Sequence, residues 1–239
     1  MKTLRLRSLL VLTLIVGVMC VSCATTTHQT RSATTSGFLG DYSQLKEGAG
    51  DQALMVYIDD QVNFDAYDKV IIDHVRLIAS EGSDMAELPK EDTQAIADYF
   101  FAALNEQLAK KYTIVKNSSP KTMQLKVALT DMTGSKVVLD TLSSLVPVGM
   151  AINLIAKVAT GNSTAVGSAT GEMELLDSAT GKRLIAAVDG RSGKKYTGKF
   201  DKWGKWQDTK DACDYWAERI ATRLDELSDA GYILKGDEK

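Results

Sequence analysis

The 239-residue sequence contains little cysteine, histidine or proline. Its three cysteines are Cys20, Cys23 and Cys213, and its two histidines are His28 and His74. So few sulfur and imidazole ligands, with no ligand spacing among them, do not support a four-ligand zinc site. They also exclude a framework of several disulfides. We therefore expect neither a metal nor an organic cofactor.

The sequence also lacks an apolar run long enough to cross a bilayer as a helix. The run 9–21 has about 13 residues, whereas a helical span needs about 20. The charge is nearly balanced, with a formal net charge of −3 at pH 7. This balance argues against a nucleic-acid-binding protein, which needs a basic footprint. The contents of 44% hydrophobic and 25% charged residues are those of a globular protein.

The N-terminus has the pattern of a bacterial export signal. Three basic residues precede the apolar run, and the small residue Ser22 precedes Cys23. This order resembles the lipobox of bacterial lipoproteins, in which the chain is cut before a cysteine that carries acyl chains such as palmitate. We therefore predict a signal peptide over residues 1–22 and lipidation of Cys23. An ordinary signal peptide is the alternative.

The residues after Cys23 predict where the protein is anchored. Ala24 stands where an aspartate would resemble an inner-membrane retention signal, and this favours the outer membrane, with the domain facing the periplasm. Residues 23–36 are rich in Thr and Ser without apolar periodicity, which predicts a flexible lipidated tether. Residues 37–239 are then expected to form a single α/β domain.

Two helices and a hairpin have the clearest patterns in this domain. The first helix begins near Pro89 and has an apolar stripe of Ile96, Phe100, Leu104 and Leu108. The last helix begins near Asp208 and has a stripe of Trp216, Ile220, Leu224 and Leu227. The hairpin joins residues 166–176 to 183–189, and further strands are predicted over 54–58, 69–78, 112–116 and 122–131. This order predicts an α/β (α+β) two-layer sandwich, a mainly antiparallel mixed sheet with helices packed on one face.

Four strings in this order carry a resemblance to a known family. They are SGFLGDYS at 36–43, NFDAYDKV at 63–70, LDSATGKRL at 176–184 and DACDYWA at 211–217. Together they resemble the bacterial lipoprotein family catalogued as domain of unknown function 3313. The resemblance implies an outer-membrane lipoprotein without an assigned reaction. The hairpin and the strand at Tyr67-Asp68-Lys69-Val70 also resemble, more weakly, assembly and secretion lipoproteins of the curli-secretion type.

Catalytic groups are sparse in the domain. His74 lies among strand residues, and a histidine bonded to a neighbour is the simpler interpretation. Cys213 has the helical spacing of the apolar stripe around Trp216, which predicts a core thiol rather than a nucleophile. We therefore expect a protein that is not an enzyme.

Two segments are candidate interaction surfaces. Basic and aromatic residues alternate in the first, which suits an anionic envelope polymer, a lipid phosphate or an acidic protein; a solvated loop whose tryptophans pack back onto the domain is the alternative. Its candidate residues are Arg191, Lys194, Lys195, Lys199, Trp203 and Trp206. The second is an apolar helix expected from Pro147, about 20 Å long and too short to span a bilayer. It is either buried or docked on a partner or membrane through Val148, Ile152 and Ile155.

These patterns together predict a non-catalytic lipoprotein that acts as a periplasmic scaffold, assembly or interaction module. Its expected partners are the membrane, through the lipid anchor, and an envelope protein or an anionic envelope polymer; nucleic acid is not expected. A carrier for a small ligand, lipid or anionic glycan is the alternative, and a hydrolase is a distant third. The sequence leaves the oligomeric state open.

Overall fold

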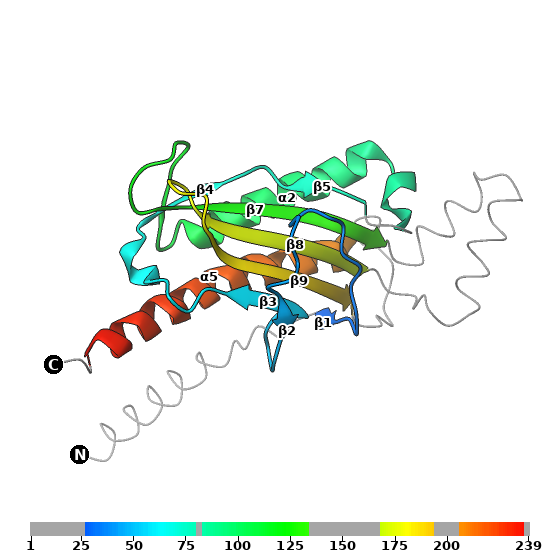
Figure 1. Cartoon of the computed structure of the whole chain (residues 1–239). Coiled ribbons are helices and arrows are strands. Elements are labelled where there is room, and N and C mark those ends of the chain that lie inside the picture. Colours follow the sequence, from blue (N-terminus) through cyan, green and yellow to red (C-terminus); the bar gives the residue numbers. More distant parts are fainter. Residues whose placement is uncertain (1–26, 80–82, 134–167, 194–205, 237–239) are drawn as a thin grey trace, which may run out of the picture.

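The computed structural model describes residues 27–79, 83–133, 168–193 and 206–236. These residues form an open mixed sheet of nine strands, with two helices packed against one face (Figure 1). Five strand pairs are antiparallel and three are parallel. The predicted fold class, an α+β sandwich with a mainly antiparallel mixed sheet, is therefore confirmed.

Three long antiparallel strands form the centre of the sheet. They are β7 (Thr122–Thr133), β8 (Ser168–Asp177) and β9 (Arg183–Gly193). On the far side of β9 lie β1 (Thr27–Gln29), β3 (Met55–Ile58) and, beyond β3, β2 (Lys46–Glu47). On the far side of β7 lie β4 (Lys69–Ile72), β5 (Arg76–Leu77) and, beyond β4, β6 (Thr113–Ile114). The hairpin predicted from the sequence is thus the middle of the sheet.

The strand predicted over residues 69–78 is divided into β4 and β5. Between them, the carboxylate of Asp73 accepts two hydrogen bonds of 3.0 Å from the side-chain amide of Gln124. The backbone N–H of Asp73 still donates to Leu125 at 2.9 Å. The interruption is therefore held in place by β7.

The helices α2 (Lys90–Leu108) and α5 (Gln207–Gly236) cover one face of the sheet. Two short 3-10 helices, η1 (Phe64–Ala66) and η2 (Asp84–Glu87), flank them. The predicted stripe of α2 is buried, with Phe100 and Leu104 at 1% and 0% exposure. Alternate residues of β7, from Met123 to Leu129, are buried beneath the helices. This helix-covered face carries the main hydrophobic core.

The opposite face of the sheet is covered by the chain between β1 and β2. Leu39 and Leu45 are buried there against Ala186 and Val188 of β9. In Figure 1 this segment, in blue, passes over the face turned away from the helices. The family string at residues 36–43 is therefore part of a second, smaller core.

The prediction of a flexible tether over residues 23–36 is wrong for residues 27–36. Thr27 is buried and pairs with Gly193, and the backbone N–H of Ser36 donates to the carboxylate of Glu172 at 2.6 Å. The Thr- and Ser-rich composition concealed this because the strand is held by backbone and hydroxyl hydrogen bonds rather than by apolar side chains. In the residues that the structure describes, no helix is long and apolar enough to cross a membrane.

Candidate functional site

Two polar residues of the first family string, Ser36 and Tyr42, bond to a buried carboxylate of the sheet. Glu172 of β8 is only 1% exposed. Its carboxylate accepts hydrogen bonds of 2.6 Å from the backbone N–H of Ser36 and the hydroxyl of Tyr42. The same hydroxyl accepts the backbone N–H groups of Gly37 and Leu39 at 2.9 and 3.3 Å. Burial and the neighbouring Glu172 carboxylate raise the pKa of Tyr42.

The turn between β8 and β9 is organised by Asp177. One carboxylate oxygen accepts three hydrogen bonds, two from Thr180 and one from Ala179, at 2.8 to 3.1 Å. The other accepts the hydroxyl of Tyr67 at 2.9 Å. Partial burial raises the pKa of Asp177, but the hydrogen bonds from Thr180, Tyr67 and Ala179 together outweigh it and leave the pKa below its ordinary value. Burial and the Asp177 carboxylate raise the pKa of Tyr67 to about 12.

The string at residues 211–217 ties α5 to the sheet. Trp216 donates its ring N–H to the buried carboxylate of Asp189 at 2.9 Å, and Asp189 also accepts the side-chain amide of Gln29 at 2.7 Å. Gly171 lies under this ring, where an added Cβ would approach it to 3.3 Å. Cys213 is fully buried, which confirms the predicted core position, and burial raises the pKa of its thiol.

An apolar cavity of about 110 Å³ lies between the sheet and α5. Side chains of β3, β8 and β9 form its floor, namely Val56, Ile58, Met173, Ile185 and Ala187. Residues of α5 form its roof, chiefly Tyr215, Trp216, Ile220 and Leu224. Four of the floor residues, all except Ile185, are only partly buried. Figure 1 shows that α5 crosses the sheet diagonally.

Two arginines and one aspartate stand at the mouth of this cavity. Arg223 lies one helical turn after Arg219 in α5. The Asp51 carboxylate, from the loop between β2 and β3, lies 2.6 Å from a guanidinium nitrogen of Arg219 and 3.5 Å from one of Arg223. Glu226 also pairs with both arginines, at 2.7 Å from Arg223 and 3.3 Å from Arg219. The cavity is thus apolar inside, and ion pairs of the two arginines with Asp51 and Glu226 border its opening.

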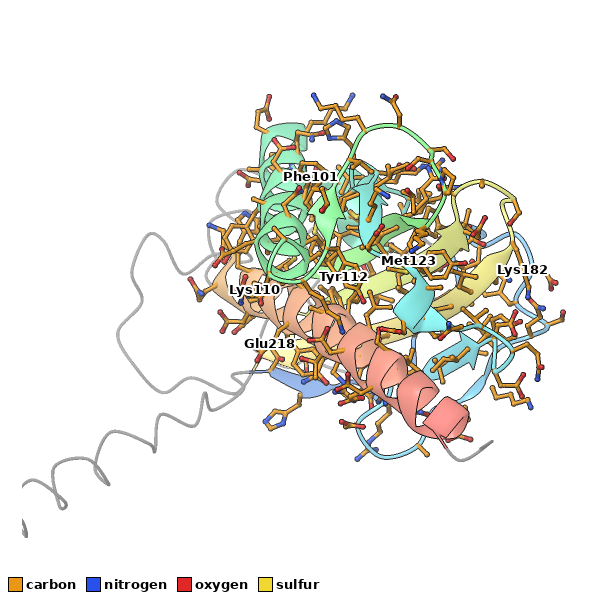
Figure 2. All side chains as sticks on the ribbon, turned by 90° about the vertical axis from the view of Figure 1, so that its left-hand side faces the viewer. Phe101, Lys110, Tyr112, Met123, Lys182 and Glu218 are labelled. Carbon is orange, nitrogen blue, oxygen red and sulfur yellow. The ribbon has the colours of Figure 1, made fainter. Side chains whose placement is uncertain are left out.

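A second hollow, of about 230 Å³, lies where α2 ends against the middle of α5. Lys110, Tyr112 and Glu218 border it, and Figure 2 shows these three side chains near one another at the end of the molecule. Lys111 pairs with Asp225 across the same helix junction at 2.9 Å. Most of its lining residues are polar or charged, and the charged ones are Lys110, Lys111, Glu218 and Asp225.

The structure places two predicted patch residues in the interior. Arg191 is 7% exposed; it donates to Thr27 and lies 3.7 Å from the ring centroid of Tyr215. Trp206 is buried in the main core. Their prediction as exposed binding residues is therefore wrong, because strand alternation directs Arg191 toward α5 and Trp206 packs at the start of that helix. The other candidates lie outside the described residues: Cys23, Lys194, Lys195, Lys199, Trp203, Val148, Ile152 and Ile155.

Histidine, cysteine and carboxylate side chains do not gather into a metal centre in the described part of the chain. His74 is exposed and stacks on Phe101 with ring centroids 4.9 Å apart. The part of the chain that the structure describes contains no group of three His, Cys, Asp or Glu side chains placed to hold a metal ion. The apolar cavity with its charged mouth is therefore the best-defined candidate site.

Sequence reasoning missed this site. Arg219 and Arg223 lie four residues apart beside the apolar stripe of the last helix, so their pairing on one helix face could have been found. The role of Asp51 has no sequence signal, because a loop in a distant part of the chain brings it there.

Comparisons with known proteins concern both the sequence and the fold. The sequence model of the family described as Protein of unknown function (DUF3313) matches residues 34–220. The uncharacterized lipoprotein YdcL of Escherichia coli K12 is 27% identical over 168 residues, covering 66% of this chain and 71% of that protein. The PelC dodecamer from Paraburkholderia phytofirmans aligns with a TM-score of 0.37 and 11% identity, covering 71% of this chain and 94% of that one. A DUF4136 family protein from Bacteroides thetaiotaomicron aligns with a TM-score of 0.35 and 15% identity, covering 71% and 95%.

Proposed function

Because the chain belongs to the family described as Protein of unknown function (DUF3313) and is similar to a lipoprotein, we propose that it is a lipoprotein anchored to the outer membrane through Cys23. Its domain is a non-catalytic interaction module that the anchor holds against the periplasmic surface of the membrane. Its partners are an envelope protein or an anionic envelope polymer.

The observation that carries this proposal is the position of β1. This strand begins at Thr27, four residues after Cys23, and pairs with the end of β9. Four residues of extended chain reach at most about 14 Å. An acylated Cys23 therefore holds one end of the sheet close to the lipid surface, rather than allowing the domain to diffuse on a long tether.

The strand register identifies this end of the sheet. Thr27 pairs with Gly193, Ser192 with Ser168, and Ser168 with Thr133. Figure 1 shows these strand ends together on the right of the sheet. In the chain, residues 134–167 connect Thr133 to Ser168 and residues 194–205 follow Gly193. Their sequences contain the apolar Val148, Ile152 and Ile155 and the basic Lys194, Lys195 and Lys199. Their attachment beside the anchor supports contact with the membrane or a membrane-bound partner.

The side-chain contacts support a non-catalytic role. Glu172, Asp177 and Asp189 each accept hydrogen bonds that hold separate parts of the fold together, so these carboxylates are engaged in structure. The apolar cavity of about 110 Å³ is smaller than the roughly 300–1,000 Å³ of pockets that enclose a drug-sized ligand. An interaction module fits these features better than an enzyme or a carrier of large ligands.

Acylation is tested by replacing the cysteine. Cys23→Ala should abolish labelling by an alkyne fatty acid and leave uncleaved precursor, whereas the matched control Cys20→Ala should be labelled and processed. In membranes separated on a density gradient, the wild type should be recovered with the outer membrane and Ala24→Asp with the inner membrane. Undiminished labelling of Cys23→Ala would refute the proposed anchor.

The orientation is tested with fluorophores on introduced cysteines, since buried Cys213 does not compete for label. His28→Cys lies on β1, and Ala179→Cys lies in the turn at the other end of the hairpin. Ten residues of β9 separate these ends by about 33 Å. Quenchers on lipid headgroups should therefore quench the label at residue 28 more strongly. Equal quenching, or stronger quenching at residue 179, contradicts the proposed orientation.

A further inference from the structure

The apolar cavity under α5 lies at the edge of the main core, where most of its floor residues are only partly buried. Its volume of about 110 Å³ lies among aliphatic and aromatic side chains and is open at the mouth, so a ligand can enter it from solvent. The small side chain of Ala187 in the floor and the partly buried Val56 and Met173 leave this space. An apolar cavity of about 150 Å³ binds benzene, so this one accommodates a group of a few carbon atoms.

The charged side chains at the mouth indicate which headgroup a bound alkyl chain would carry. Arg219 and Arg223 direct their guanidinium groups to the same side of α5, and the carboxylate that lies between them, that of Asp51, is 72% exposed. Planar guanidinium groups bind carboxylates and phosphates through paired hydrogen bonds. Asp51 therefore occupies the position in which the anionic headgroup of a ligand would be bound.

We propose that this cavity binds a small anionic amphiphile, a carboxylate or phosphate monoester on a short alkyl chain. The end of the alkyl chain enters the space above Ala187 and below Trp216. The headgroup displaces the Asp51 carboxylate and pairs with Arg219 and Arg223. This site is distinct from the lipid anchor and does not depend on acylation of Cys23.

Binding is measured by calorimetry on residues 23–239 carrying Cys23→Ser, a chain that contains every residue the structure describes. The probes are octanoate and monooctyl phosphate at low ionic strength, with octanol and octyltrimethylammonium as neutral and cationic controls. Both anionic probes should bind saturably, at one site and at least about tenfold more tightly than the controls, because charge-assisted bonds to arginine form only with an anion. Tighter binding of octanoate indicates a fatty acid, and tighter binding of octyl phosphate indicates a phosphate-bearing lipid fragment.

Three variants locate the site. Arg219→Gln combined with Arg223→Gln should weaken octanoate binding by about tenfold or more, whereas Arg76→Gln, which removes one positive charge on β5 outside the cavity, should leave it unchanged. Asp51→Asn should strengthen binding several-fold, because it removes the competing carboxylate. Ala187→Leu should fill the cavity and abolish binding while the domain stays folded.

Four results overturn the inference. They are the absence of saturable binding of either anion, equal binding of octanol, weaker binding by Asp51→Asn, and unchanged binding by Ala187→Leu. Thermal unfolding of each variant identifies any that fails to fold. Asp51→Asn and Ala187→Leu keep the test decisive if the double arginine variant does not fold, because neither removes an arginine.

Discussion

At the scale of single residues, buried polar groups are satisfied by partners from distant parts of the chain. Glu172 is buried on the face opposite the helices, where Ser36 and Tyr42 donate hydrogen bonds to it. Arg191 is buried on the other face, between the oxygens of Thr27 and the ring of Tyr215. Removal of one partner from such a group is costly because the other remains buried without it.

Tyr42→Phe tests this for Glu172. The substitution removes the hydroxyl that donates to the carboxylate and accepts two backbone N–H groups. We expect the free energy of unfolding in urea to fall by about 1–3 kcal/mol. Tyr57→Phe is the matched control: it removes a hydroxyl from the same small core, with an expected change under about 0.5 kcal/mol. Equal effects of the two substitutions would contradict the role given to Tyr42.

Cys213 gives a second prediction at this scale. Its thiol is fully buried and burial raises its pKa, so the reactive thiolate is scarce and shielded. A thiol reagent should modify it only in denaturant, and Cys213→Ser should lower stability by about 1–3 kcal/mol, the cost of burying a hydroxyl. Rapid modification of the native protein would show instead that α5 opens.

At the scale of elements, the β8–β9 hairpin is the unit on which the rest of the sheet is assembled. Its strands pair with each other, with β7 on one side and with β1 and β3 on the other. Asp177 organises its turn, and Lys182 in the same turn lies 2.6 Å from the carboxylate of Asp59. The turn therefore joins the hairpin to the start of the chain segment after β3.

Asp177 in this turn makes the stability of the fold depend on pH in the acidic range. The pKa of folded Asp177 lies below its ordinary value of 3.8, so the folded state binds this proton less readily than the unfolded chain. The stability that the group contributes is present above about pH 4 and is lost as the pH falls through the folded pKa. Asp177→Ala should therefore destabilise the protein at pH 7, and the difference from the wild type should narrow near pH 3. The control Asp65→Ala, at an exposed position of η1, should show little difference at either pH.

At the scale of the whole molecule, the N-terminal segment joins the domain to its proposed anchor and also completes the fold. Thr27–Gln29 extends the sheet, and Gln29 reaches the carboxylate of Asp189, which Trp216 of α5 also contacts. Residues 33–45 then cover the second face. The few residues of this strand therefore link the proposed anchor to the sheet and, through Asp189, to α5.

Truncation distinguishes this arrangement from a flexible tether. Deletion of residues 24–36 should destabilise the domain by more than about 3 kcal/mol, because it removes a strand and uncovers apolar surface and the buried Glu172. Deletion of residues 24–26 alone is the control and should leave the unfolding midpoint nearly unchanged. Equal stability after both deletions would restore the tether interpretation.

The sequence by itself determined the elements and the class of fold. Local patterns suffice for this. The recurrence of Ile96, Phe100 and Leu104 at every fourth residue specifies a buried helix face, and alternation of apolar and polar residues on both sides of a turn specifies the β8–β9 hairpin. Family membership also followed from strings of adjacent residues. These properties depend on neighbours along the chain, which the sequence displays directly.

Only the tertiary structure decided which residues meet across the chain. It shows that Arg191 and Trp206, which the sequence suggested as surface residues, are buried, and that Thr27–Gln29 forms a strand. It also placed Asp51 beside Arg219 at the mouth of an apolar cavity. Strand order and the angle at which a helix crosses a sheet are set by packing of the whole molecule, so contacts between residues so far apart in sequence follow from that packing and not from local pattern.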